Sequence, residues 1–527
     1  MFKKTRMISG TPSVVGNPVI QANLKRKSEL KLVIYNNSSM KEKEDAKEKL
    51  EEVEEALANE TAADNVEKVK GYIKSVETLD GNFCQVSFWK LKRRLWPSDS
   101  DPPMGKSDGN GNLITAAEPL KRLYLNTYED RLKHRLMKPE LMDVYFLKTE
   151  LWMSRLNNME QIKTRKWNHA KLDAVLCSLK NNKCMDPTGT INEIFKAGCI
   201  GTDLKEALLC LFNGIKEAQF LPMFMTLGNI TSIYKSKGSR SDLANDRGIF
   251  ILTVLKKILD KLIYEDNYKE LDENMTDSNV GARKRRNIKD HLLIIHGVIN
   301  SVIRGDDECI DIQIYDIIKC FDAMWLEDSM NDIVDTLTEQ KHNDEISMLY
   351  RSNMDNKVAI KTSAGLTERI DVPCVVQQGG TWGSMMCSNS IDTFGKKCIE
   401  RGEHIYRYKK TTRILPLAFV DDLNGISKCG KESLALNIFL TTQIELKKLR
   451  FHVPDQSGKT KCHKMHIGRK NSNCPTLKVH GTVMPQVTED VFLGDIICSN
   501  GKNTQNIKSR ISKGVGISNQ IFNMLEM

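Results

Sequence analysis

The sequence predicts an α+β fold. From about residue 203 onward, helical patterns alternate with β-rich runs in an irregular order, unlike the regular strand–helix repeat of a doubly wound sheet. The 527 residues are enough for several domains with a large core. Hydrophobic residues make up 40% and charged residues 28% of the chain, which is the usual balance for a protein that folds in water.

The first part of the chain is expected to be a disordered and then helical extension. Residues 1–37 are polar and lack periodicity, which predicts disorder. Residues 38–60 begin with serines that can cap a helix and carry one apolar stripe among charges. Proline, glycine, aspartate and serine crowd into 97–115, which predicts a linker. Helical patterns resume at 117–165, so we expect 38–165 to form a helical N-terminal extension.

The strands are predicted by short runs of β-branched and aromatic residues between turn residues. These runs are 227–234, 309–316, 356–362, 414–422 and 462–468. No run of about 18 apolar residues is present, so we expect no membrane span. The basic start of the chain lacks the apolar core of a signal peptide, so we expect a nuclear or cytoplasmic protein that is not secreted. The 14 scattered cysteines are then expected to be free thiols.

Acidic residues end two of the predicted strands. Alternating isoleucines in 310–314 share their face with Asp316, and an apolar run ends in Asp421 and Asp422. A charge on such a face is costly unless a cation meets it. Oxygen ligands without His or Cys favour two Mg²⁺ ions, with Mn²⁺ as an alternative. Taken alone, each acidic site is better explained as an exposed strand end. We expect the hairpin turn after the second strand at Leu423 and Asn424.

Two further segments carry residue types that suit a nucleotide. Gln378 and Gly379 precede an apolar, helix-compatible run, and adjacent glycines let a backbone approach a flat ligand. The alternative is a plain glycine turn before a helix. Lys235 and Arg247 flank a polar loop between two strand-like runs, where they could grip a triphosphate. The alternative there is a basic hairpin tip.

The net charge of +10 has two interpretations of similar weight. The basic residues cluster, most densely at 24–27, 90–94 and 282–286. Such clusters suit the phosphate backbone of a nucleic acid. They are also compatible with a solvated basic face that binds nothing.

Together, the ordered motifs resemble the reverse transcriptase domain of non-LTR (LINE-like) retrotransposons. The resemblance runs from about Lys180 to Gly494 and includes, in the family's order, NDRGIFIL, NVGARKRRNIKDHLLII, YDIIKCFDAMW, QQGGTWGS, AFVDD, KCHKMHIG and FLGDII. Each motif is weak alone, but the ordered set is specific. The resemblance implies a right-hand polymerase fold, with fingers and palm at 166–470 and a primer grip and the start of a thumb at 471–527.

The resemblance also implies roles for particular residues. Asp316, Asp421 and Asp422 would hold the metal ions and carry the catalysis. The nucleotide would be bound by six residues, with Phe321 as the steric gate against a ribose 2′-hydroxyl: Lys235, Arg247, Phe321, Gln378, Gly379 and Lys461. The implied function is an RNA-directed DNA polymerase, a nucleotidyltransferase with an RNA template, a DNA primer or target DNA, and dNTPs as partners.

Some features depart from the family's pattern. Gly383 and Ser384 stand where the family has Ser-Pro, and Thr188 replaces another polar residue. We expect the thumb to be largely missing and find no endonuclease motif, so the alternative function is a truncated, catalytically inactive nucleic-acid-binding remnant of such an element. The stretch 461–474 also suggests a zinc site of Cys462, His463, His466 and Cys474. On a strand, however, His463 and His466 would point to opposite faces, which argues against it.

Overall fold

The structure is a computed structural model of the chain, and it divides into two compact units. It describes residues 19, 22–23, 25–27, 29–30, 44–56, 105–108, 110–133, 139–158, 166–196, 201–235, 238–337, 343–354, 356–372, 375–449, 462–468 and 475–525. One unit contains residues 1–101 and 507–527, and the other contains residues 102–506. No helix among the described residues is both long enough and apolar enough to cross a membrane.

In the first unit, the described parts are helical. Residues 44–56 form a helix inside the predicted 38–60 segment, and its Ala46 and Val53 are buried. The few described residues of 1–37 are also helical, where we expected disorder, and Lys27 pairs with Glu54 at 2.7 Å. Helix α15 (Thr504–Leu525) begins at the end of the second unit and continues into the first.

The second unit contains a four-stranded and a five-stranded sheet. The four-stranded sheet has the order β4 (Asp246–Leu252), β3 (Leu227–Tyr234), β6 (Asn356–Thr362), β7 (Gly365–Val372). The five-stranded sheet has the order β10 (Leu417–Phe419), β11 (Asp422–Lys428), β5 (Ile310–Asp316), β12 (His463–Ile467), β15 (Gln486–Val487). Four two-stranded hairpins complete the strands: β1 (Lys106–Ser107) with β2 (Leu113–Ile114), β8 (Tyr406–Tyr408) with β9 (Thr412–Ile414), β13 (Lys478–Val479) with β14 (Thr482–Val483), and β16 (Glu489–Phe492) with β17 (Asp495–Cys498).

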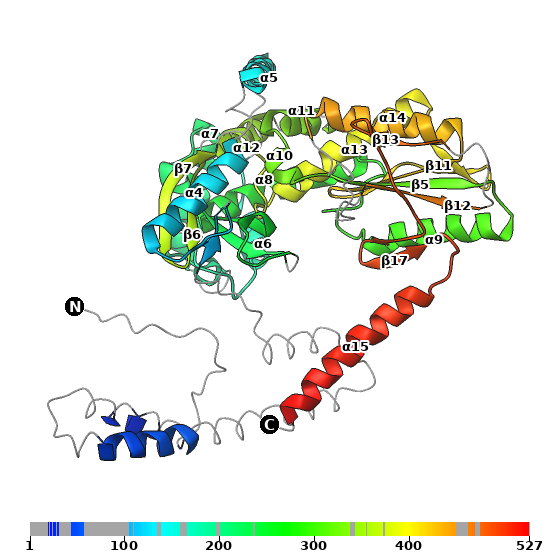
Figure 1. The fold of residues 1–527 in the computed structure, drawn as a ribbon. Coiled ribbons are helices and arrows are strands. Elements are labelled where there is room, and N and C mark those ends of the chain that lie inside the picture. The colour runs from blue at the N-terminus through cyan, green and yellow to red at the C-terminus, as the bar shows by residue number, and fades with distance from the viewer. Residues whose placement is uncertain are drawn as a thin grey trace. The chain divides into compact units, whose positions relative to one another are not determined.

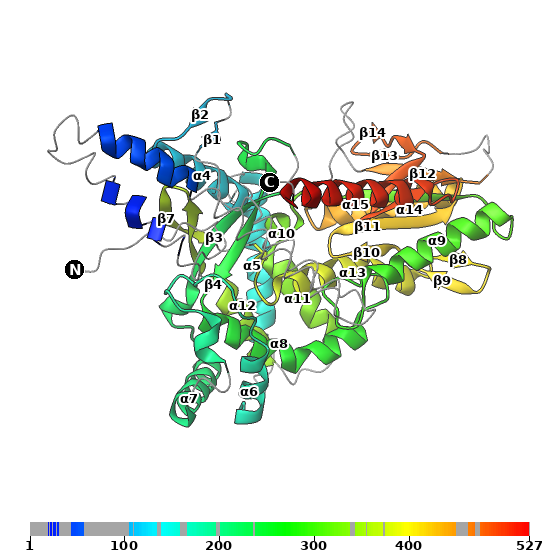
Figure 2. The same ribbon diagram turned by 90° about the horizontal axis from the view of Figure 1, so that it is seen from below.

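Helices surround and separate the two sheets. They are α4 (Ala117–Lys133), α5 (Pro139–Asn158), α6 (His169–Cys177), α7 (Thr202–Ala218), α8 (Val254–Asn274), α9 (Ile288–Arg304), α10 (Cys320–Ala323), α11 (Leu326–Thr336), α12 (Asn343–Met354), α13 (Gly383–Arg401) and α14 (Lys431–Leu446), with short 3₁₀ turns at Asn192–Phe195, Met223–Thr226 and Leu243–Asn245. Helices α10, α11 and α13 lie between the sheets, as Figure 1 and Figure 2 show. This mixture of segregated sheets and helices is the predicted α+β class.

The five-stranded sheet is buried on both faces. Ile310, Ile312 and Ile314 of β5 pack against apolar residues of α9 in one core cluster. On the other face, the Gln313 side chain donates to the Ser433 carbonyl oxygen of α14 at 2.7 Å. Figure 1 shows α14 and α9 on opposite sides of this sheet. The first six residues of β5 are buried, although Asp311 and Gln313 alternate with the isoleucines, so the strand is a rigid support for Asp316 at its end.

Four of the five predicted strands match the structure. Strands β3 and β6 have the predicted bounds, and β5 and β12 differ from the prediction by one residue at one end and at both ends, respectively, whereas the run 414–422 is divided between the end of β9, the short strand β10 and the first residue of β11. The hairpin turn predicted at Leu423 and Asn424 is wrong, because these residues lie inside β11 and pair with β5. The turn is instead Val420–Asp421, since Phe419 pairs directly with Asp422.

Part of the predicted linker segment is buried in the structure. Within 97–115, Lys106 lies in the β1–β2 hairpin and is fully buried in an ion pair of 2.7 Å with Asp246. Helix α4 packs on the four-stranded sheet and belongs to the same compact unit as both sheets. The compact units divide between residues 101 and 102, and the predicted domain boundary between 165 and 166 stays a prediction. Packing between residues so far apart in the chain cannot be predicted from the local sequence.

Candidate functional site

Three carboxylates meet at one end of the five-stranded sheet. Asp422 is the first residue of β11, and Asp316 is the last residue of β5; the antiparallel register pairs them directly. Side chains opposite each other in such a pair have Cβ atoms about 5 Å apart. Asp421 precedes Asp422 in the hairpin turn. All three acids are partly buried. The structure therefore brings together the three acids that the sequence singled out.

The turn that carries Asp421 is held by a buried side chain. Val420 has φ +60°, a left-handed conformation that is unfavourable for a β-branched residue. The amide oxygen of Asn279 accepts from the Val420 N–H at 3.1 Å, and the amide nitrogen donates to the Val420 carbonyl oxygen at 3.1 Å. A side chain on Gly281 would come within 2.5 Å of the Val420 nitrogen. Asn279 and Gly281 together fix the turn, and sequence reasoning gave neither a role.

The electrostatics of the acids suit a bound cation. Burial raises the pKa of Asp421 to about 6, and the charges of Asp422 and Asp316 act in the same direction, opposed in part by Arg247. Converging carboxylates repel each other, and their charged forms become favourable when a divalent cation binds between them. The residues present therefore fit the Mg²⁺ that the resemblance implies.

The two basic residues predicted to bind phosphates, Lys235 and Arg247, interact electrostatically with these acids. Arg247 of β4 is the strand partner of Ile233, and the backbone N–H of Lys235 donates to the Asn245 carbonyl oxygen at 2.9 Å across the same hairpin. Burial lowers the pKa of Lys235, as do Arg131 and Arg247, whereas Asp322 and Asp316 oppose the change. The β3–β4 hairpin thus presents its positive side chains toward the acidic end of the other sheet.

Sequence reasoning missed Arg131 and Lys319. Arg131 of α4 is buried, donates to the Leu243 carbonyl oxygen, and has its guanidinium 4.9 Å from the centre of the Tyr128 ring. Burial raises the pKa of Asp322, and Arg131, Lys319 and Lys235 oppose the rise. Three positively charged side chains, Arg131, Lys319 and Lys235, therefore act on Asp322, next to the three acids. No local signal marks Arg131, because it is more than a hundred residues before Lys235 in the chain and meets it only in the fold.

Phe321 lies on α10, and Gln378 and Gly379 precede α13; both helices lie between the two sheets. Phe321, on the short helix α10, is partly buried and packs against the largest core cluster. The Gln378 carbonyl oxygen accepts from the Phe250 N–H of β4 at 2.8 Å. Gly379 has φ +111°, and a side chain there would lie 2.8 Å from the Phe250 carbonyl oxygen. The close approach that Gly379 permits is thus to β4, which supports the plain-turn interpretation of this glycine.

Close packing explains why glycine stands at position 383, one of the departures from the family's pattern. A Cβ atom at this position would lie 2.1 Å from the Gln377 carbonyl oxygen, where no side chain fits. Gln377 itself is buried, and its amide has no hydrogen-bond partner among the described residues. The glycine therefore allows α13 to begin directly against the 377–380 turn.

A second hairpin, β16–β17, lies beside the acids. Leu493 and Gly494, which form the turn between β16 and β17, line a cavity of about 110 Å³ together with Asp316 and Asp422. Asp495, next in the chain, pairs with His296 of α9 at 3.0 Å. The FLGD segment, predicted to begin a primer grip, thus lies beside the carboxylates.

The remaining predicted residues do not join the site. Lys461 and Cys474 lie outside the described residues. His463 pairs with Asp490 at 2.9 Å, whereas His466 pairs with Asp311 at 2.9 Å. The two histidines therefore point to different faces of β12, which agrees with the strand periodicity that argued against a zinc site in this stretch.

Comparison with known proteins finds matches among solved structures. No protein-family model matches the sequence, and no curated protein is similar to it. The fold is similar to apo telomerase from Candida tropicalis, truncated from its C-terminal domain, with a TM-score of 0.36 and 14% sequence identity. The similarity covers 56% of this chain and 59% of the telomerase chain, which is less than two thirds of its length. The function proposed below rests on the acids and cations of this chain itself.

Proposed function

We propose that the chain is an RNA-directed DNA polymerase of the non-LTR retrotransposon type. The observation that carries the proposal is the direct pairing of Asp316 with Asp422, with Asp421 in the adjoining turn. Three carboxylates fixed by one sheet are what a two-metal phosphoryl-transfer site requires. The basic groups beside them supply what a triphosphate requires, which is positive charge held in place.

Each part of the site has a distinct task in this reaction. The three acids would hold two Mg²⁺ ions, whose charge would lower the pKa of the primer 3′-hydroxyl and offset negative charge on the reacting phosphate. Lys235 and Arg247 bind and orient the phosphates of the incoming dNTP. The 493–494 turn holds the primer end near Asp316 and Asp422. Lys461 is proposed, from the resemblance alone, to meet the leaving pyrophosphate.

The choice of a DNA product rests on Phe321. Its neighbours on both sides in the chain, Cys320 and Asp322, belong to the helix that follows the Asp316 strand. A bulky ring at this place, beside the sugar of a bound nucleotide, leaves no room for a ribose 2′-hydroxyl. An RNA-dependent RNA polymerase would use the same acids but needs a smaller residue here.

The direct test is primer extension by the purified full chain. With an RNA template, an annealed DNA primer, dNTPs and Mg²⁺, we expect extension that depends on the metal. Asp421→Asn should reduce the extension rate at least about 100-fold, the scale seen when one charge-stabilising group is removed. Asp371→Asn is the matched control, because Asp371 is an exposed residue of β7 in a long ion pair with Lys357.

Two outcomes would contradict the proposal. Extension that is equal in wild type and Asp421→Asn would mean that the acids do not catalyse it. Tight binding of the primer–template without extension in either protein would instead favour a nucleic-acid-binding remnant without catalysis.

A further inference from the structure

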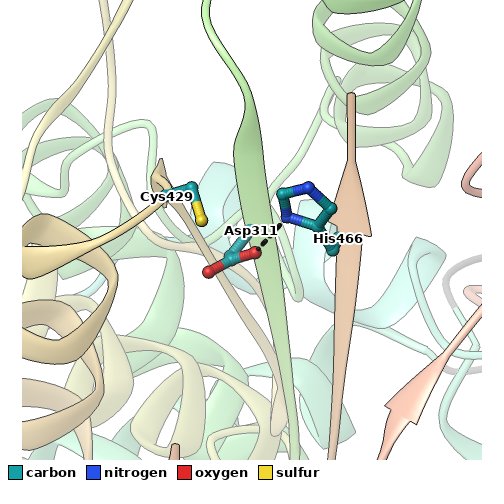
Figure 3. Close-up of side chains that lie close together, drawn as sticks. All are labelled: Asp311, Cys429 and His466. Atoms are coloured by element: carbon teal, nitrogen blue, oxygen red, sulfur yellow. Dashed lines mark hydrogen bonds and ion pairs between the residues drawn. The ribbon is translucent and has the colours of Figure 1, made fainter. Parts of the chain in front are cut away.

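A second cluster of metal-ligating side chains lies at the opposite end of the five-stranded sheet. Asp311 stands at the start of β5, five residues before Asp316, which at about 3.4 Å per residue places the two ends about 17 Å apart. Near it lie His466 of β12 and Cys429, which directly follows β11. One ligand atom from each of Asp311, Cys429 and His466 lies within 4.8 Å of the other two. Figure 3 shows the three side chains close together.

The strand register explains why these three side chains share a face. His466 is the direct partner of Asp311 across the β5–β12 pair. Lys428 is the partner of Ile310 across the β5–β11 pair, and the Cys429 N–H donates to the Cys309 carbonyl oxygen at 3.0 Å, which extends that register by one residue. Directly opposite residues project to the same face, and residues two apart along a strand do so too. The cluster is therefore built by three neighbouring strands.

Only one of the two carboxylate oxygens of Asp311 accepts a hydrogen bond within the described part of the chain. It is fully buried, and its Oδ1 pairs with His466 Nδ1 at 2.9 Å. Its Oδ2 is buried without a hydrogen bond within the described part of the chain, and its partner there is Lys464 Nζ, in a long ion pair of 3.7 Å. The Oγ of Ser427, the β11 partner of Asp311, is likewise buried without a hydrogen bond there. Unsatisfied buried oxygens cost about 1–3 kcal/mol each, which a bound cation would offset.

We propose that Asp311, Cys429 and His466 form a zinc site distinct from the polymerase acids. A thiolate, an imidazole and a carboxylate are the ligand types that Zn²⁺ accepts in tetrahedral sites, whereas Mg²⁺ prefers oxygen alone. On binding, the Cys429 thiol releases its proton to solvent, and the metal replaces the hydrogen bond between His466 and Asp311. The ion fastens β11, β5 and β12 together at the end far from Asp316.

The site is tested by metal titration of the full chain, stripped with a chelator and kept reduced. Co²⁺ is the first probe, because a cobalt–thiolate bond gives a charge-transfer absorption band, and Zn²⁺ should then displace it. We expect one equivalent to bind and the thermal unfolding midpoint to rise with Zn²⁺. Cys429→Ser should abolish the band, and both Cys429→Ser and His466→Gln should weaken Zn²⁺ binding at least about 10-fold.

His463→Gln is the matched control, because His463 lies on the same strand but pairs with Asp490 on the opposite face. It should bind Co²⁺ and Zn²⁺ as the wild type does. If His466→Gln fails to fold, Cys429→Ser decides the question, since Cys429 is only partly buried. Absence of stoichiometric binding in the wild type, or equal binding by Cys429→Ser and His463→Gln, would overturn the proposal.

The zinc site and the polymerase activity are independent proposals, and different variants test them. Asp421→Asn, which removes one of the polymerase acids, should bind Zn²⁺ as tightly as the wild type. Conversely, Cys429→Ser should retain Mg²⁺-dependent extension at temperatures below its unfolding midpoint. Loss of Zn²⁺ binding in Asp421→Asn would mean that the bound metal occupies the carboxylates and not the Cys429 cluster.

Discussion

The raised pKa of Asp421 makes the stability of the protein depend on pH. Its pKa is raised to about 6, above its ordinary value of 3.8, by burial and by the two neighbouring carboxylates. Because the folded state prefers the protonated acid, the stability that this group contributes is present at low pH and is lost as the pH rises through about 6. The mutual repulsion of these carboxylates is therefore a cost to the metal-free protein at neutral pH.

This cost can be measured with Asp421→Asn. In the absence of metal, the free energy of unfolding of the wild type should fall by about 1 kcal/mol from this group between about pH 5 and about pH 8, whereas the variant should lack that fall. Mg²⁺ should raise the unfolding midpoint of the wild type at about pH 8 more than that of the variant. Urea unfolding at both pH values, with and without Mg²⁺, measures both effects. Identical pH profiles for the two proteins would contradict the assigned electrostatics.

Phe321 is the residue that should set sugar selection. Phe321→Val removes most of the ring while keeping a β-branched apolar residue, so the discrimination against ribonucleotides should fall at least about 10-fold. The measurement is the ratio of kcat/KM for dNTP and rNTP on the same primer–template. The ring also packs partly against the core, so the unfolding midpoint must be measured alongside. Unchanged sugar selection in a folded variant would remove Phe321 from the gate.

At the scale of elements, the β10–β11 hairpin depends on a segment far away in the sequence. Asn279 is fully buried, and it bonds both the N–H and the carbonyl oxygen of Val420 as well as the Ser388 carbonyl oxygen. Asn279→Ala leaves these backbone groups without partners, so it should lower the free energy of unfolding by about 2–3 kcal/mol. It should also slow extension at least about 10-fold, because the turn that carries Asp421 is no longer fixed.

The matched control for this effect is Asn267→Ala. Asn267 is equally buried and bonds the Ile263 carbonyl oxygen and Glu345, far from the acids. A similar loss of stability with normal extension at low temperature is expected there. If both variants lose extension in proportion to their stability, Asn279 has no separate role in positioning the turn.

The elements also show which features a sequence can predict. Strands β3 and β6 have their predicted bounds, because their β-rich runs lie between clear turn residues. The three acids could be predicted because each ends an apolar run. The Val420 turn could not, since valine disfavours a positive φ and is held there by Asn279. Arg131 could not either, because only the packing of α4 on the four-stranded sheet brings it to the site.

At the scale of the whole molecule, the compact unit of residues 102–506 contains every described residue of the candidate site. Helix α4 is part of that unit, because Leu120, Tyr124 and Tyr128 are buried in one cluster with Ile230 and Phe250 of the four-stranded sheet. The Lys106–Asp246 ion pair ties the β1–β2 hairpin to the same sheet. Removing one partner of a buried pair leaves an uncompensated charge, which typically costs about 3–5 kcal/mol.

Two truncations therefore have opposite expected results. A chain that begins at residue 102 should keep the unfolding midpoint of this unit, and its extension rate at saturating primer–template should stay within about twofold of the full chain. A chain that begins at residue 166 loses α4 and β1, exposes the core beneath α4 and leaves Asp246 without Lys106, so it should be unfolded or aggregated. Circular dichroism and primer extension distinguish the two. A folded, active chain from residue 166 would contradict the part assigned to α4 and would support the boundary that the sequence predicts.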